Sequence, residues 1–107
     1  MSPEERFAKI VMSLKGLPKV SVGASKSGFG SSALCVSKKI FAMISSKGRF
    51  VVKLPKHRVV ALVVAGAGSR FEPARGRVMN EWLAVDSDWD GDWLLLAREA
   101  MRFVGKK

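Results

Sequence analysis

Residues 34–55, LCVSKKIFAMISSKGRFVVKLP, constrain the fold more than any other segment of this chain. They contain three runs rich in β-branched and aromatic residues, and short polar breaks of the kind found in hairpin turns separate these runs. We therefore expect residues 34–36, 40–44 and 50–54 to form three consecutive strands that pair as hairpins. Both turns are basic, one at Ser37-Lys38-Lys39 and the other at Ser46-Lys47-Gly48-Arg49.

The middle strand is apolar on both of its faces, because Ile40, Ala42 and Ile44 alternate with Phe41 and Met43. Such a strand is typical of the centre of a sheet.

The third strand carries Phe50, Val52 and Leu54 on one face, while Val51 and Lys53 lie on the other. If helices cover one face of the sheet, the other face presents an apolar set made of Phe41 or Ile40, Met43 or Ile44, and Val51. That set is more apolar than a free surface requires.

Three segments have helical patterns. The first begins at a capping box, with Ser2 as N-cap, Pro3 at the first helical position and Glu5 closing the box. The second runs from Pro55 to about residue 65, is apolar around most of its circumference and is expected to be well buried. The third runs from about residue 92 to 104 with a continuous apolar stripe. The side chains expected to be buried on these stripes are Phe7, Ile10, Val11, Leu14, Leu62, Trp93, Leu96 and Ala100.

The remaining segments complete the predicted architecture. Residues 20–32 read as a short strand or extended entry followed by a flexible loop, residues 70–77 as a polar connection around Pro73 and Gly76, and residues 78–85 as one more strand. We expect a single α+β domain over residues 1–107, a two-layer sandwich in which helices pack against an antiparallel sheet of about five strands.

Charge is concentrated in the middle of the chain. The net charge is +10, and residues 38–77 hold ten Lys and Arg residues against one acid, Glu72. An excess of this kind favours an anionic partner such as nucleic acid, an acidic protein or an anionic lipid.

Sequence motifs for catalysis or metal binding are weak. Asp86-Ser87-Asp88-Trp89-Asp90-Gly91 matches the first half of a calcium loop, but the acid needed at its last position falls on Ala97. Helix capping explains these acids better. The single His57 and single Cys35 are too few for a zinc site, and the glycines at 28 and 30 precede a strand rather than a phosphate-binding helix.

We expect a non-enzymatic protein with no metal and no cofactor. The lone cysteine also favours a reducing compartment, and with no signal peptide or membrane span in the pattern we expect a cytoplasmic protein.

Four segments together resemble a bacterial family: FGSSALCV at 29–36, KIFAM at 39–43, VKLP at 52–55 and FEPARGRVMNEWL at 71–83. Their order is similar to that of the TfoX N-terminal and MmcQ/YjbR group, whose members share the YjbR/CyaY-like fold. The resemblance implies a two-layer α+β arrangement and a DNA-binding or competence-regulator-like role. The first helix lacks the acidic character of true frataxins, which share a related fold, and this argues against iron binding.

The functional prediction is a DNA-binding or regulatory protein that contacts phosphates through cations of the strand-rich centre and of the 70–77 segment. The candidate residues are Lys38, Lys39, Lys47, Arg49, Lys53, Lys56, Arg58, Arg70, Arg75 and Arg77. The alternative is a protein-interaction module of unknown partner, with a homodimer through the apolar sheet face as one form of it. A solvated basic surface with no partner would show the same charge, because charge alone gives only attraction without sequence preference.

Overall fold

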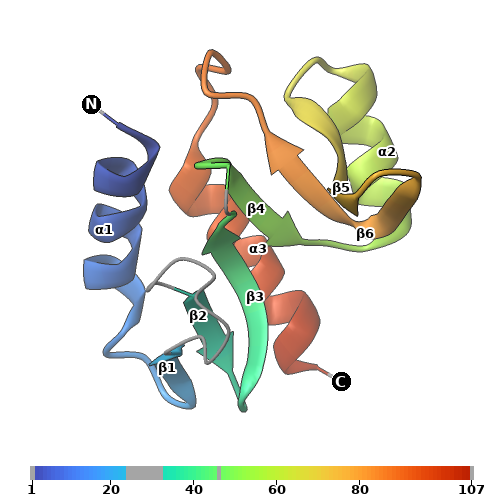
Figure 1. Cartoon of the computed structure of the whole chain (residues 1–107). Helices are drawn as coiled ribbons and strands as arrows, with labels where there is room; N and C mark the ends of the chain where they lie inside the picture. The colour runs from blue at the N-terminus through green and yellow to red at the C-terminus, as the bar shows by residue number, and fades with distance from the viewer. Residues whose placement is uncertain (1, 24–32, 46, 107) are drawn as a thin grey trace.

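The computed structural model describes residues 2–23, 33–45 and 47–106 (Figure 1). The predicted loop at 24–32, Ser46 and Lys107 lie outside the described residues. The elements in chain order are α1 (Pro3–Leu14), β1 (Val20–Gly23), β2 (Ala33–Val36), β3 (Lys39–Ile44), β4 (Phe50–Lys53), α2 (Lys56–Val64), β5 (Gly68–Ala74), β6 (Arg77–Val85) and α3 (Trp93–Gly105).

The described strands form one antiparallel sheet in the order β1-β2-β3-β4-β6-β5, so the predicted α+β class is confirmed. The three predicted strands at its centre are present as β2, β3 and β4. The sheet has six strands rather than about five, because the segment predicted as a polar connection forms most of β5. Pro73 made that segment look like a break. It is tolerated because β5 is an edge strand, where proline has no ladder hydrogen bond to lose, and the β5–β6 register is irregular between Phe71 and Ala74.

The turn between β2 and β3 has the backbone of a tight hairpin. Ser37 and Lys38 both have positive φ, 50° and 70°, as a two-residue turn that follows the twist of the strands requires. The β2–β3 register shifts between Leu34 and Cys35, where Leu34 pairs with Ala42 but Cys35 pairs with Ile40. Phe41 is therefore the extra residue of a β-bulge, and its side chain joins the hydrophobic core with that of Ala42.

All three helices cover the same face of the sheet. One hydrophobic cluster contains buried side chains of α1, α2 and α3 together with Val52 and Leu83 from the centre of the sheet. In Figure 1, α3 runs behind the sheet and α1 lies beside β3. Phe50 marks the junction: its ring lies 5.9 Å from that of Phe7 and is stacked on that of Trp93 at 4.6 Å, measured between ring centroids.

Burial of the helical stripes agrees with the prediction at seven positions, and Val11 is partly buried against the core. The expectation for α2 was wrong. Val59 and Leu62 are buried, but Val60 and Val64 are 36% and 82% exposed. The helix lies against β5 and β6 towards one side of the sheet, so nothing among the described residues encloses its outer face.

The helix ends follow the predicted local chemistry. Ser2 and Glu5 form the reciprocal capping box of α1, and the Asp92 carboxylate accepts a hydrogen bond from the Leu95 N–H at the start of α3. After α2, Gly66 adopts a φ of 83°, and the next residue donates its N–H to the Leu62 carbonyl, which is a Schellman ending.

The face of the sheet opposite the helices carries the apolar set predicted from the sequence. The β-bulge at Phe41 determines which of the alternative side chains belong to this set. Ile40 is 40% exposed, Met43 is partly buried and Val51 is fully buried, and none of these belongs to the helix-facing cluster. Phe41 and Ile44, the alternatives at the two open positions, lie in the core instead.

Candidate nucleic-acid interface

The β5–β6 ribbon, defined as Gly68–Ala74 and Arg77–Val85 with their turn, forms one side of the described sheet and is largely exposed (Figure 1). Only the last three residues of β6 are buried, and no residue of β5 is. A strand that packs on a core has one buried face, whereas both faces of the outer part of this ribbon reach solvent. The ribbon lies at the side of the sheet away from α1 and is supported from one side by α2.

Three arginines lie on the ribbon. Arg70 is on β5, Arg75 is in the turn and Arg77 begins β6, and all three side chains are exposed. The turn that presents them is held by Gly76, whose φ is 83° and whose N–H donates to the Glu72 carboxylate at 2.6 Å. The one acid of the central segment therefore closes the turn, next to the arginines.

The ten candidate cations do not form one continuous surface. Lys38 and Lys39 lie at the start of β3, while Lys47 and Arg49 follow its other end, so the two basic turns are separated by the length of that strand. Lys53 ends β4 and pairs with Trp82 of β6, which places it at the ribbon. The seven exposed candidates are Lys38, Lys39, Lys47, Lys56, Arg70, Arg75 and Arg77.

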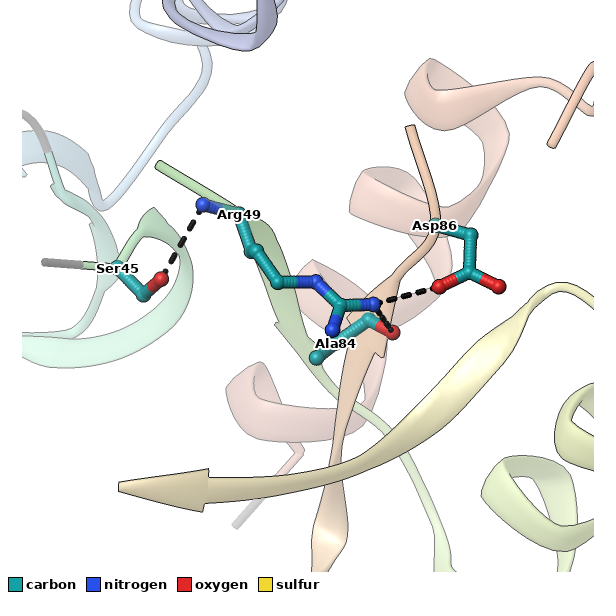
Figure 2. A network of polar contacts seen from close by, with 4 residues as sticks. All are labelled: Ser45, Arg49, Ala84 and Asp86. Atoms are coloured by element: carbon teal, nitrogen blue, oxygen red, sulfur yellow. Dashed lines mark hydrogen bonds and ion pairs between the residues drawn. The ribbon is translucent and has the colours of Figure 1, made fainter. Parts of the chain in front are cut away.

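Arg49 is bound within the protein, as Figure 2 shows. Its Nη2 atom donates to the Asp86 carboxylate at 2.7 Å and to the Ala84 carbonyl at 3.2 Å, and its backbone N–H donates to the Ser45 hydroxyl at 3.2 Å. These contacts connect the β3–β4 turn to the loop after β6. A guanidinium held this way is less available to a phosphate, so Arg49 is better explained as a structural residue.

Arg58 is bound as well. Its guanidinium makes two hydrogen bonds of 2.9 Å to the Glu99 carboxylate, which links α2 to α3. This hydrogen bonding raises the pKa of Arg58, so the side chain stays charged. The fork geometry matches both carboxylate oxygens. We therefore also assign Arg58 to the helical layer rather than to a ligand surface.

Lys53 is the third partly buried candidate, and its partner is aromatic. The Lys53 Nζ lies 5.6 Å from the ring centroid of Trp82, which is itself partly exposed. The sequence prediction included the lysine but missed the tryptophan. Its only sequence signal was an aromatic residue among the arginines of the FEPARGRVMNEW segment.

A cleft of about 510 Å³ lies at the end of the ribbon opposite its turn, between the start of α1, the β3–β4 turn and the loop after β6. Its charged lining is mixed, with Lys47 and Arg49 facing Asp86 and Asp88. Because Arg49 and Asp86 already form an ion pair, the cleft presents no concentrated charge of one sign. Its lining residues are Pro3, Lys47, Gly48, Arg49, Phe50, Val85, Asp86, Ser87, Asp88 and Trp93.

The acidic loop before α3 acts locally in the structure. Asp92 caps the helix, as expected for an acid at this helix start, whereas Asp86 pairs with Arg49 instead of capping. Within 2–23, 33–45 and 47–106, no group of three or more His, Cys, Asp or Glu side chains is placed to hold a metal ion. Cys35 is buried in β2.

Comparisons of this chain with protein-family models, with curated proteins and with solved structures found no match. The resemblance to the TfoX and MmcQ/YjbR group therefore stays a prediction from the four sequence segments. Among the helices of the described residues, none combines the length and the apolar content needed to cross a bilayer.

Proposed function

We propose that this protein binds nucleic acid without catalysing a reaction, and that the β5–β6 ribbon is the main contact surface. The observation that carries the proposal is the exposure of both faces of the outer part of the ribbon together with its three arginines. This outer part does not contribute to the core, and exposed guanidinium groups are suited to phosphate oxygens.

The neighbouring cations extend this surface. Lys53 is paired across from Trp82 on β6, and the exposed Lys56 follows at the start of α2, which packs on the ribbon. With the three ribbon arginines this gives five positive charges. Phosphate contacts by these side chains would give binding that depends strongly on salt and weakly on sequence.

The alternative proposal, a homodimer through the sheet face opposite the helices, has less support from the geometry. Val51 and Ala84 on that face are 0% and 4% exposed within a single copy. Little apolar surface at these central positions is left for a partner to cover. Light scattering tests this alternative directly, and a concentration-dependent doubling of mass would favour it.

The test of the proposed function is a fluorescence-anisotropy titration of labelled DNA at low salt with three proteins. The ribbon variant carries Arg70→Ala, Arg75→Ala and Arg77→Ala. The control variant carries Arg98→Ala and Arg102→Ala on α3 and Lys106→Ala at its C-cap, where all three side chains are exposed, so it loses the same net charge.

We expect the parent and the α3 variant to bind with similar affinity and the ribbon variant to bind much more weakly. Equal losses in both variants would mean that net charge alone drives binding. No binding by the parent at low salt would refute the proposed function.

A further inference from the structure

We infer that the nucleic acid bound by the ribbon is single-stranded and that an unpaired base stacks on Trp82. This inference rests on the proposed function and adds the class of ligand.

Trp82 lies on the sheet face opposite the helices. It pairs with Lys53, and the next residue along β6, Leu83, belongs to the helix-facing core, so Trp82 points the other way. Its ring is absent from the set of side chains packed against that core. The ring is nevertheless only partly exposed, because it lies in the surface of the sheet rather than on a free loop. A rigid aromatic ring of this kind is a suitable stacking surface for a base.

The other two tryptophans have core roles. Trp93 is 4% exposed, with the guanidinium carbon of Arg6 3.6 Å from its ring centroid and the Phe50 ring stacked on it. Trp89 is partly buried and packs against the core cluster. Trp82 is thus the tryptophan whose position has no explanation in core packing.

Lys53 gives the site its positive charge. Its Nζ lies 5.6 Å from the Trp82 centroid, close to the outer limit of about 6 Å for a cation–π contact. Such a loose contact is readily exchanged. A base that stacks on the ring would displace the ammonium group, which remains near enough to meet the phosphate of the same nucleotide.

Single strands fit this site better than duplex does. The flat face of a base is accessible to a side chain only where the base is unstacked. Arg75 and Arg77 at the turn of the ribbon are then available for backbone contacts, whereas Arg70 pairs with Leu83 and lies on the helix-facing side, away from Trp82. Phe71 is a second, partly exposed aromatic residue on the same ribbon and would serve a neighbouring base.

The experiment measures affinities of the parent, Trp82→Phe and Trp82→Leu for labelled oligothymidine and for duplex of equal length. The oligonucleotide is about 20 nucleotides long, which exceeds the usual site of about 4–16. Trp82→Leu keeps apolar bulk but removes the stacking surface, while Trp82→Phe keeps an aromatic face. Trp89→Leu is the control, because it removes a tryptophan at the other side of the sheet.

We expect the parent to prefer the single strand and Trp82→Leu to lose about 5- to 150-fold of that affinity, the range equivalent to one stacked base. Trp82→Phe is expected to retain most of the affinity, and Trp89→Leu to match the parent. Oligothymidine should quench tryptophan emission in the parent but not in Trp82→Phe.

Binding of both ligands with no effect of Trp82→Leu would overturn the stacking inference and leave the proposed function intact. A preference of the parent for duplex would also overturn it. Absence of any binding would instead refute the proposed function on which the inference rests.

Discussion

Replacing Phe50 by Ala tests the packing of the helical layer on the sheet. Phe50 is fully buried in β4, next to Ile44 of β3 and Val85 of β6, and its ring contacts both Phe7 and Trp93. The side chain therefore connects the sheet with α1 and α3 at one point. Removal of a buried phenylalanine costs about 3–5 kcal/mol of unfolding free energy, since transfer and cavity terms add.

The stacked ring of Trp93 places the cost in the upper part of that range. Phe50→Leu keeps most of the volume and loses only the ring contacts, so we expect a loss of about 1–1.5 kcal/mol. Urea denaturation followed by far-UV circular dichroism measures both variants, with the slope against urea checked for constancy. A loss below about 1 kcal/mol for Phe50→Ala would show that the described packing around Phe50 is wrong.

Three further outcomes follow from local geometry. Gly68→Ala should cost about 1–3 kcal/mol or more, because a Cβ there would overlap the backbone of β6, whereas Gly16→Ala meets no atom within 4 Å and should be nearly neutral in the same denaturation assay. The hydrogen bond from the N-cap backbone lowers the pKa of Glu5 below 4.5, so its carboxylate stabilises the fold above that pH and loses this effect as the pH falls through the lowered value; the stability difference between the parent and Glu5→Gln should shrink in acid. Ser37→Asn combined with Lys38→Gly should raise the melting temperature, because these residues suit the positive φ of both turn positions; an unchanged or lower melting temperature would contradict this turn geometry.

Local features of the fold were predictable because their causes are local. The capping box at Ser2 and Glu5 depends on residues three positions apart. The hairpin was expected from the short polar break at Ser37-Lys38-Lys39, although Lys39 belongs to β3 and only Ser37 and Lys38 form the turn. Runs of β-branched and aromatic residues similarly identified β3 and β4. Each of these predictions required only the neighbours in sequence.

Errors arose where a pattern has different meanings in different tertiary settings. Pro73 indicates a break in most strands but is acceptable at an edge, and the sequence does not say that β5 is an edge strand. The apolar run of α2 suggested a well-buried helix, yet Val64 is 82% exposed because the helix covers the sheet with one side only.

The candidate site was predicted only in part for the same reason. The arginines of the ribbon were identified from charge. From the sequence, Arg49 and Arg58 were as plausible as phosphate contacts as the ribbon arginines. Their partners, Asp86 and Glu99, are 37 and 41 residues away, and only these contacts show that the two arginines act within the fold. The pairing of Lys53 with Trp82 also depends on a strand contact that composition does not reveal.

The salt dependence of DNA binding tests the central claim most directly. The measurement is the association constant of the parent and of the ribbon variant between about 50 and 200 mM salt. If about five side chains contact phosphates, the parent slope of log affinity against log salt is about −4 to −5 for duplex and about −3.5 for a single strand. Removal of the three ribbon arginines should reduce the slope by about 2 to 3. An unchanged slope in the ribbon variant would contradict the assignment of the ribbon as the contact surface.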